Sequence, residues 1–565
     1  MQAQSGMQRS IRYALAFIAG GIACADDPAR PVRPLAATVP AVRGAASVPP
    51  AASLSVKVAV PASMRTSPFN VDRFLTVPPN FSVAVYARVP GARFMSTAPN
   101  GDVLVSNPGA GSVYLVRPGA SGADPTVTTW ASGLYKPHDI VFHALNGVTY
   151  VYIAEGDKIA RYTYSTASTT GQGRQVIISG LPSASTPELQ GAYGHELKNI
   201  VLDSNHKLYV SIASTCNVCL SDTQSNPVRA AIYVYDADGA NGRIFARGLR
   251  NAEGLAMLPG TNTLWVVVNN RDNIAYPFQN DWDGNGSNDY GKVMQSYVDN
   301  HPPDEFTSVR EGGNYGWPFC NPNPDSPSGM NNMPFDRDVE QNGDGSRLDC
   351  TTADRISKGI QAHSAPLGVT FLQGTNAPAS YREGVVVPLH GSWNRASRTG
   401  AKVVYFAWDP ATQLPDQQID LVSGWLVSGS YWGRPVDAAV GPDGGIYISD
   451  DQTGTIYRLE YAPPPPPPEP PPPPPPPPAP PPPPPSTSVA RFTYSCSALT
   501  CSFNAASSSG ATSYAWSFGD GGTATGVAPS HAFPGRGNYP VQLSTLPAGG
   551  QSSTTQTVRC KPKGC

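Results

Sequence analysis

Histidine, arginine and asparagine side chains recur in unusual short strings between residues 193 and 437. The candidates for chemistry in these strings are His195, Arg250, Asn251, His363, Arg395 and Arg434. A neutral imidazole has a reference pKa of ~6.5, which suits it to accept a proton near pH 7. Arginine and asparagine side chains that met in one cavity would suit a polyanionic ligand. A lone histidine is more often structural than catalytic, so the strings predict a proton-transfer site only if the fold brings them together.

A second group of polar residues forms a loop with oxygen-bearing side chains at alternate positions around glycines. These side chains are Asp281, Asp283, Asn285 and Asp289. Their spacing resembles the start of an EF-hand loop, in which oxygen ligands bind calcium. The bidentate glutamate of that loop is missing, and Lys292 stands in its place. A structural calcium ion and a plain polar turn both remain open for this loop.

The elements that must position these residues are expected to be β-strands. From residue 67 to residue 461 the sequence consists of short apolar runs bounded by Gly, Asn, Asp and Pro. Four of the runs follow the same tight polar turn, and these turns begin at Pro99, Ser204, Gly260 and Pro442. A turn-plus-strand unit that recurs over ~400 residues without a convincing amphipathic helix predicts repeated four-stranded blades. We therefore expect an all-β chain with a six-bladed β-propeller at 67–461; an array of β-sandwiches is the alternative.

Composition agrees with turn-rich β structure and excludes two kinds of partner. The chain has 565 residues, including 55 Gly and 61 Pro, and only 14% are charged. Gly and Pro punctuate turns and weaken helix interiors. The formal net charge of -2 argues against a nucleic-acid partner, which would call for a basic patch. No apolar run reaches the ~18–20 residues of a transmembrane helix, so no membrane span is expected.

The first 25 residues have the pattern of an export signal. Arg9 and Arg12 form a basic region, an apolar stretch follows, and small residues end it at Ala25. This order is typical of a signal peptide. We therefore expect a signal peptide at 1–25 and a secreted or periplasmic protein. Lipid attachment at Cys24 is the alternative.

Removal of residues 1–25 would leave eight cysteines, which fall into pairs of near neighbours. The pairs are Cys216/Cys219, Cys320/Cys350, Cys496/Cys501 and Cys560/Cys565. An even number of cysteines in an exported chain indicates disulfide bonds. Zinc is the other reading of the first pair, but a zinc site needs four ligands and no second Cys-x-x-Cys or nearby histidine pair completes one. Disulfide bonds are the prediction.

Three further segments complete the expected domain organisation. Residues 26–66 are rich in Ala, Pro and Val without stable periodicity, which predicts a disordered lead-in. Residues 462–486 are almost pure proline, which predicts a stiff polyproline II linker. Residues 487–565 form a small β module. Its Trp516-Ser-Phe-Gly-Asp-Gly521 run resembles the polycystic-kidney-disease (PKD) type domain, which implies an immunoglobulin-like β-sandwich and a glycan or cell-surface ligand.

The polar strings of residues 70–461 together resemble the soluble sugar dehydrogenases that depend on pyrroloquinoline quinone (PQQ). The branch with L-sorbosone dehydrogenase and fungal pyranose dehydrogenases is the most similar. The specific parts are Arg250-Asn-x-x-Gly-Leu-Ala and Gly312-Gly-Asn-Tyr-Gly-Trp-Pro318. The resemblance implies PQQ and Ca²⁺ as cofactors and a small sugar as substrate. The sequence does not indicate the electron acceptor.

The resemblance also implies catalytic roles for two residues. His195 stands twelve residues before Lys207, which is the spacing of the family's general base. Arg250 and Asn251 fall on the family's Arg-Asn pair, which contacts the cofactor. His195 would take the hydroxyl proton of the sugar while a hydride passes to PQQ. Calcium and Arg250 would stabilise negative charge on the quinone oxygens.

Other positions carry over from the family with changes. Asn270 and Arg271 fall where backbone carbonyls hold calcium, but the family's Gly-Pro is absent there. Arg434 falls on an arginine that contacts the cofactor's carboxylates. The family's cofactor-contacting lysine has no clear equivalent, and Arg395 is the expected substitute. His363, also expected to contact the cofactor, stands where the glucose-oxidising branch has threonine.

Two other functions are compatible with a propeller. A calcium-dependent propeller lactonase would need inward Glu, Asn and Asp ligands at the axis, and the sequence does not assemble that set. A non-catalytic propeller that binds carbohydrate or a cell surface agrees with the PKD-like module. Convergence of His195, Arg250, Asn251 and Arg434 in one cavity would favour the dehydrogenase, and their dispersal would favour a binding protein.

Overall fold

The computed structural model describes residues 49–463, 487–546 and 551–565. The predicted signal peptide and all but two residues of the predicted linker lie outside these ranges. Among the described residues, no helix is long and apolar enough to span a membrane.

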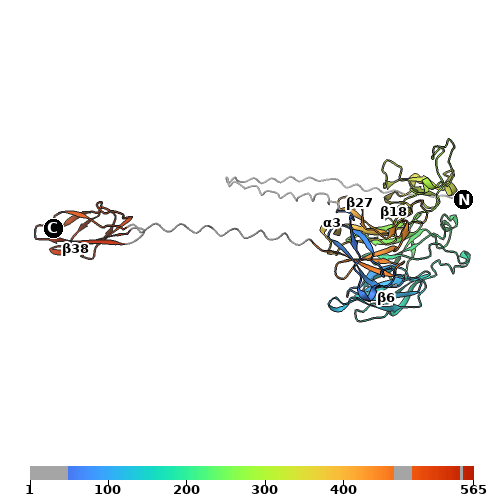
Figure 1. Cartoon of the computed structure of the whole chain (residues 1–565), viewed down its shortest axis with the longest axis horizontal. Helices are drawn as coiled ribbons and strands as arrows, with labels where there is room; N and C mark the ends of the chain where they lie inside the picture. The colour runs from blue at the N-terminus through green and yellow to red at the C-terminus, as the bar shows by residue number, and fades with distance from the viewer. Residues whose placement is uncertain (1–48, 464–486, 547–550) are drawn as a thin grey trace, which may run out of the picture. The chain divides into compact units, whose positions relative to one another are not determined.

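The chain divides into two compact units, residues 1–465 and 466–565. The first unit is built from strands, with short helices at α1 (Gln295–Val298), α2 (Val339–Asn342) and α3 (Ala379–Arg382). The expectation of an all-β chain is therefore confirmed, and Figure 1 shows β6, β18 and β27 of this unit in different sheets.

Six sheets of four or five strands form the framework of the described part of the first unit, which also contains three two-stranded sheets. The first comprises β4 (Met95–Thr97), β5 (Val103–Asn107), β6 (Ser112–Arg117) and β7 (Thr126–Ala131). The second comprises β8 (Ile140–Leu145), β9 (Val148–Ala154), β10 (Lys158–Thr163) and β11 (Gln172–Ser179). The third comprises β12 (Ile200–Leu202), β13 (Lys207–Ile212), β14 (Ala231–Asp236), β15 (Arg243–Arg247) and β19 (Gly313–Asn314).

The remaining three sheets follow in chain order, except that the last one joins the two ends of the unit. The fourth comprises β16 (Ala252–Met257), β17 (Leu264–Val268), β18 (Asp304–Val309), β23 (Ile356–Ile360) and β21 (Asn331–Met333). The fifth comprises β24 (Thr370–Phe371), β25 (Val385–Leu389), β26 (Lys402–Asp409) and β27 (Leu414–Val422). The sixth comprises β30 (Pro435–Val440), β31 (Ile446–Asp450), β32 (Thr455–Tyr461) and the N-terminal strand β3 (Phe81–Arg88).

Polar turns start the second strand of four sheets, as the sequence predicts. The turns at Pro99, Ser204, Gly260 and Pro442 lead into β5, β13, β17 and β31. Gly101 and Gly260 have φ angles of 87° and 77° in two of these turns. Glycine adopts this left-handed region without the steric cost that other residues meet there. The turn chemistry therefore decides where each of these strands begins.

Apolar packing joins each sheet to the next and the last sheet to the first. Six clusters of buried apolar side chains lie between consecutive sheets. β17 shows why both faces must be apolar: Leu264 and Val266 pack toward the third sheet, whereas Trp265 and Val267 pack toward the fifth. Successive side chains of a strand point to opposite faces, so a strand between two sheets is apolar throughout. This cyclic packing is a β-propeller-like fold.

The first strands of the sheets approach one another on the inside of this arrangement. β4 contacts β8 and β30, and β12 contacts β8 and β16. Gly254 of β16 lies so close to the fifth sheet that a Cβ atom would come within 2.4 Å of the Leu367 carbonyl oxygen. The loops at one end of these inner strands therefore lie close together, although they are far apart in sequence.

The lead-in prediction is wrong for the part of it that the structure describes. Residues 54–57 form β1 (Leu54–Lys57), which pairs with β2 (Phe74–Val77), and η1 (Ala62–Met64) is a 3₁₀ turn. Val58 is fully buried in the cluster between the fifth and sixth sheets. The segment lacks its own periodicity because its partners are supplied by distant parts of the chain.

The second unit consists of two sheets around one apolar core. One contains β33 (Thr493–Ser497), β34 (Thr500–Asn504) and β37 (Ser530–Ala532). The other contains β36 (Thr523–Thr525), β35 (Ser513–Ser517), β38 (Gly537–Leu546) and β39 (Ser552–Cys560). Trp516, Phe518 and Phe503 pack together between the sheets, which is the sandwich expected from the Trp516–Gly521 run. All four predicted disulfide bonds are present.

Candidate active site

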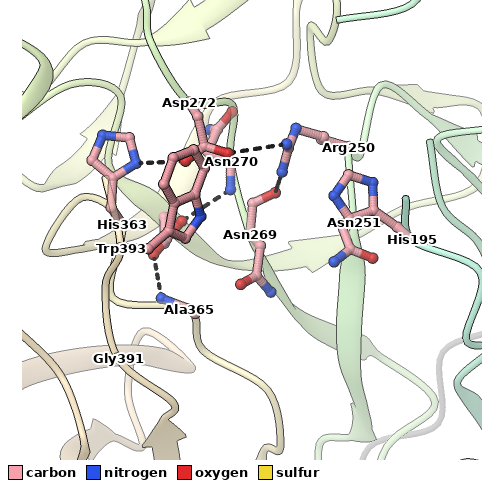
Figure 2. Close-up of a pocket in the computed structure, with 11 residues that line it drawn as sticks. His195, Arg250, Asn251, Asn269, Asn270, Asp272, His363, Ala365, Gly391 and Trp393 are labelled. Atoms are coloured by element: carbon pink, nitrogen blue, oxygen red, sulfur yellow. Dashed lines mark hydrogen bonds and ion pairs between the residues drawn. The ribbon is translucent and has the colours of Figure 1, made fainter. Parts of the chain in front are cut away.

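One pocket gathers side chains from loops at the same end of the third, fourth and fifth sheets (Figure 2). Its lining residues are His195, Arg250, Asn251, Asn269, Asn270, Asp272, Asp304, His363, Ala365, Gly391 and Trp393. The empty space of the pocket, including solvent at its mouth, is about 450 Å³. Five of the residues predicted for chemistry or ligand binding therefore lie in one cavity.

Strand ends explain why these residues meet. Asn251 precedes β16, Asn269 and Asn270 follow β17, and Asp304 begins β18. Neighbouring antiparallel strands alternate in direction, so the start of one strand and the end of the next lie at the same sheet edge. Gly391 lies just after β25 and so joins the pocket from the fifth sheet.

His195 is held in one tautomer by the backbone. Its Nδ1 lies 2.9 Å from the Ser214 carbonyl oxygen and 3.0 Å from the Ser214 hydroxyl. A carbonyl can only accept, so Nδ1 carries the proton and Nε2 keeps a free lone pair. Burial, followed by the positive charge of Arg250, lowers the pKa of His195 to about 4. The imidazole is therefore neutral near pH 7, as a general base must be.

Arg250 is a buried cation at the wall of the pocket. Its guanidinium donates to the Asn217 carbonyl and side-chain oxygens, both at 3.0 Å, and to the Asn269 carbonyl at 3.3 Å. Asp272 lies 3.5 Å from the same group. Burial lowers the pKa of Arg250 to about 10, which still leaves the side chain charged at neutral pH. The cation is therefore fixed in place before any ligand arrives.

His363 lies across the pocket, with Asp272 between it and Arg250 (Figure 2). Its Nε2 donates to the Val298 carbonyl at 2.8 Å, and its Nδ1 lies 3.4 Å from the Asp272 carboxylate. Burial opposes the charged form, but Asp272 and Asp304 outweigh it, and the pKa of His363 is raised. Both ring nitrogens face acceptors, which favours the imidazolium form.

Asp304 adds a carboxylate to the pocket, and Glu305 is buried next to it in β18. Asp304 accepts hydrogen bonds from the Asn270 and Ala365 backbone amides at 2.9 and 3.0 Å. Burial raises the pKa of Asp304 to about 6 and that of Glu305 well above its usual value. Glu305 Oε2 is buried without a hydrogen-bond partner in the described part of the chain. Buried carboxylates beside amide oxygens are the kind of surroundings that a hard cation such as Ca²⁺ prefers.

Three predicted arginines do not line the pocket with their side chains. Arg271 is buried and pairs with Asp338 and Glu340, so only its backbone is available for the carbonyl role predicted for it. Arg434 donates to the carbonyls of His390 and Gly391 at 2.9 and 3.2 Å. It therefore supports the backbone of the pocket residue Gly391.

Arg395 is the third of these arginines. It donates weakly to the Ala362 and Ser397 carbonyls at 3.4 and 3.3 Å. Ala362 directly precedes His363, so Arg395 supports the loop that carries a pocket residue. Arg395 was predicted to take the place of a cofactor-contacting lysine, but it is not among the residues that line the pocket.

The acidic loop folds apart from the pocket. Carboxylate oxygens of Asp281, Asp283 and Asp289 lie within 4.8 Å of one another. Asp289 also pairs with Lys292 at 2.9 Å, and Asp281 accepts from the Gly286 backbone amide at 2.7 Å. Asn285 Oδ1 accepts a hydrogen bond from the Ser287 backbone amide. The loop gathers the oxygens that calcium would need, and its own hydrogen bonds also explain its shape.

Sequence reasoning assigned no role to six residues of the pocket: Asn269, Asp272, Asp304, Ala365, Gly391 and Trp393. Asn269 and Asp272 flank the predicted Asn270, and Trp393 stands two residues before Arg395. Trp393 is 71% exposed, which is unusual for the largest apolar side chain. The motif that contains Trp393 can be recognised in the sequence. That its indole is exposed at a pocket can be seen only in the structure.

The chain is similar to known proteins in both sequence and structure. The TrAA12-like family matches residues 75–462, and the PKD domain family matches residues 480–561. An uncharacterized protein of Borreliella burgdorferi is 25% identical over 396 residues, which cover 68% of this chain and 91% of that protein. A PQQ-dependent pyranose dehydrogenase of Coprinopsis cinerea is 26% identical over 352 residues, or 55% of this chain and 44% of that longer protein.

Solved structures agree with these matches at the level of the fold. The holo PQQ domain of pyranose dehydrogenase from Coprinopsis cinerea aligns with a TM-score of 0.55 at 20% identity, covering 68% of this chain and 97% of that one. A carbohydrate-active enzyme of family AA12 from Trichoderma reesei aligns with a TM-score of 0.54 at 19% identity, covering 69% and 98%. The predicted resemblance to PQQ-dependent sugar dehydrogenases with a C-terminal PKD domain is confirmed. The chain belongs to the TrAA12-like family through residues 75–462.

Proposed function

We propose that residues 67–461 form a six-bladed β-propeller dehydrogenase that oxidises an aldose or sugar aldehyde with calcium-bound PQQ. One observation carries the proposal: His195, Arg250, Asn251, Asn270 and His363, predicted separately from sequence, line one pocket. Arg434, which was also expected to converge there, does not line the pocket with its side chain. It donates instead to the carbonyl of the pocket residue Gly391. The six sheets are the proposed blades, and β3 beside β32 closes their ring.

The residues of the pocket fit PQQ and a calcium ion. PQQ is a planar ortho-quinone with three carboxylates, so it needs cations and hydrogen-bond donors. Arg250 and Asn251 would hold these oxygens, and His363, whose ring nitrogens already face Val298 and Asp272, would line the site beside them. The carbonyls of Asn270 and Arg271, with Asp304 nearby, would hold calcium. When bound, the cofactor supplies the two-electron acceptor for a hydride.

His195 has the geometry of the base in this reaction. Its protonated Nδ1 faces the Ser214 carbonyl, so its Nε2 is the nitrogen available to a substrate hydroxyl. The neighbouring Arg250 cation favours the neutral imidazole and would stabilise an anion that forms beside it. His195 thus holds the hydroxyl and removes its proton as the carbon–hydrogen bond breaks.

Trp393 is the proposed contact for the sugar ring. Its indole is 71% exposed and lines the pocket. Aromatic rings present a broad apolar face on which the C–H groups of a sugar can pack, while the sugar hydroxyls stay hydrated. The exposed indole would therefore orient a small sugar over the cofactor.

The other parts of the chain have proposed roles outside catalysis. Residues 1–25 would export the protein to the periplasm or the medium, with lipid attachment at Cys24 as the alternative. Residues 462–486 would act as a spacer, and residues 487–565 would bind a glycan or a cell surface. The loop with Asp281 and Asp283 would bind a structural calcium ion away from the pocket.

Reconstitution tests the proposed function. The full chain is stripped with a chelator, dialysed, and assayed with an artificial electron acceptor against a panel of aldoses and sugar aldehydes. We expect turnover only when PQQ and Ca²⁺ are both added. Equal turnover without either addition, or none with both present over the whole panel, would rule out the proposal.

A further inference from the structure

Asn217 lies behind the pocket, inside the four-residue loop closed by the Cys216–Cys219 disulfide. It does not line the pocket, yet it contacts two residues that do. Its side-chain oxygen accepts from Arg250 Nη2 at 3.0 Å and from the Asp272 backbone amide at 2.8 Å. Its side-chain nitrogen donates to the Asp272 carbonyl at 2.8 Å. The side-chain amide of Asn217 therefore forms hydrogen bonds with the backbone amide and carbonyl of Asp272 and with Nη2 of Arg250.

The backbone of Asn217 also fixes the position of Arg250. Its carbonyl accepts from Arg250 Nε at 3.0 Å and from the Trp317 indole at 3.2 Å. Arg250 thus has two of its donors fixed by one residue, which defines both the position and the rotation of the guanidinium. A planar guanidinium held at two nitrogens loses little further freedom when a ligand binds.

The disulfide loop also reaches the proposed base. The Ser214 hydroxyl donates to the Cys216 carbonyl at 2.9 Å. That hydroxyl has a single proton, so towards His195 Nδ1 it can only accept, as the Ser214 carbonyl does. The Ser214 amide in turn donates to the Arg250 carbonyl at 2.8 Å. His195 and Arg250 are therefore tied to the same few residues of chain.

We propose that the Cys216–Cys219 loop is the positioning element of the pocket, and that Asn217 is the residue through which it fixes Arg250 and Asp272. The effect on catalysis rests on the proposed function, whereas the effect on the pocket's geometry does not. Only asparagine offers an acceptor and a donor at this reach. Aspartate lacks the donor, alanine lacks both, and the longer glutamine would displace the Asp272 backbone.

The test compares three variants of the full chain with a matched control. Asn217→Ala removes the side-chain contacts, Asn217→Asp keeps the acceptor oxygens, and Cys216→Ser/Cys219→Ser opens the loop. Cys496→Ser/Cys501→Ser removes another short disulfide loop, but from the second unit. The thermal unfolding midpoint of each variant identifies a protein that fails to fold, and Asn217→Asp is the variant that best preserves size.

The first readout does not depend on enzyme activity. Hydrogen–deuterium exchange of the apoprotein follows the Asp272 amide, whose acceptor is Asn217 Oδ1. We expect this amide to exchange on the order of 10-fold faster in Asn217→Ala, where its acceptor is absent, and in the double serine variant, where the acceptor is no longer held by a closed loop. The Asn269 amide, which donates to the Asn251 carbonyl, and the control variant should stay unchanged. Unchanged exchange at Asp272 in Asn217→Ala would overturn the proposal.

The second readout is the affinity of the apoprotein for PQQ and the turnover that follows. We expect Asn217→Ala to weaken PQQ binding and lower kcat on the order of 10-fold, with Asn217→Asp in between and the KM for sugar little changed. Faster exchange at Asp272 with wild-type affinity and kcat would overturn the role of Asn217 in positioning. If the wild-type chain binds no PQQ, the proposed function fails, and the exchange experiment still decides whether Asn217 holds the pocket.

Discussion

The Nδ1 atom of His195 lies 2.9 Å from the carbonyl oxygen of Ser214, and this contact decides what the imidazole can do. A backbone carbonyl cannot donate, so the proton of a neutral ring is held at Nδ1. Nε2 is then the basic nitrogen in a pocket that also contains a fixed arginine. The chemistry that we propose for the pocket depends on this tautomer.

Replacing the base tests that chemistry. We expect His195→Gln to lower kcat on the order of 10²–10⁴-fold, because a positioned base is lost while the size of the side chain is nearly kept. PQQ affinity and the thermal unfolding midpoint should stay close to the wild-type values, and they are the controls. Normal turnover with normal cofactor binding would show that His195 is structural.

The surroundings of His195 also predict how turnover depends on pH. Burial and Arg250 lower the pKa of His195 to about 4, compared with ~6.5 for an unfolded histidine. The neutral base should persist as the pH falls through 6.5, so kcat/KM should decline only near pH 4. Over the same window the unfolded state binds a proton that the folded state does not, so this residue's contribution to stability is lost as the pH falls from about 6.5 to about 4.

Measuring kcat/KM between pH 4 and pH 8, with PQQ and Ca²⁺ saturating throughout, checks the pH prediction. The residual activity of His195→Gln is the control for other titrating groups. A fall centred near pH 6.5 in the wild type, absent from His195→Gln, would contradict the lowered pKa.

Trp393 gives a prediction about the substrate. We expect Trp393→Ala to raise the KM for sugar about 10-fold, because an aromatic contact is worth roughly 1 kcal/mol beyond the apolar area that it buries. Trp393→Phe should recover most of the loss. Steady-state kinetics with PQQ titrations on the apoprotein separates the alternatives. A loss of PQQ affinity with an unchanged KM would mean that the indole stacks on the cofactor.

The second unit is expected to be dispensable for chemistry. A chain that ends after Tyr461 keeps every strand of the six sheets and every pocket residue, so its kcat on soluble sugar should stay within about 2-fold of wild type. Retention on insoluble polysaccharides, measured by pull-down, should fall if the PKD domain binds glycans. A large loss of soluble turnover in the shortened chain would show that the two units act together.

Strand positions could be predicted from sequence because turns are local. The polar turns at Pro99, Ser204, Gly260 and Pro442 fix strand starts through residues a few positions apart. β1 could not be predicted in the same way, since Leu54–Lys57 becomes a strand only by pairing with Phe74–Val77. Its own sequence carries no signal for that partner.

The pocket was predictable in its residues but not in its side-chain directions. The resemblance to the sugar dehydrogenases assigned His195, Arg250 and Asn251 to one site, and the loops that carry them lead into β12 and β16. Spacing could not show that Arg434 turns to the Gly391 carbonyl, or that Asp272 lies between Arg250 and His363. These directions depend on partners from other sheets, which only the folded chain brings together.

The most direct test of the central claim is the absorption spectrum of the chain loaded with PQQ and Ca²⁺, recorded before and after one equivalent of sugar without an electron acceptor. We expect the bound quinone to be reduced within a single turnover in the wild type, and on the order of 10²–10⁴-fold more slowly in His195→Gln. Reduction at equal rates in both proteins, or no binding of PQQ to the wild type, would contradict the account.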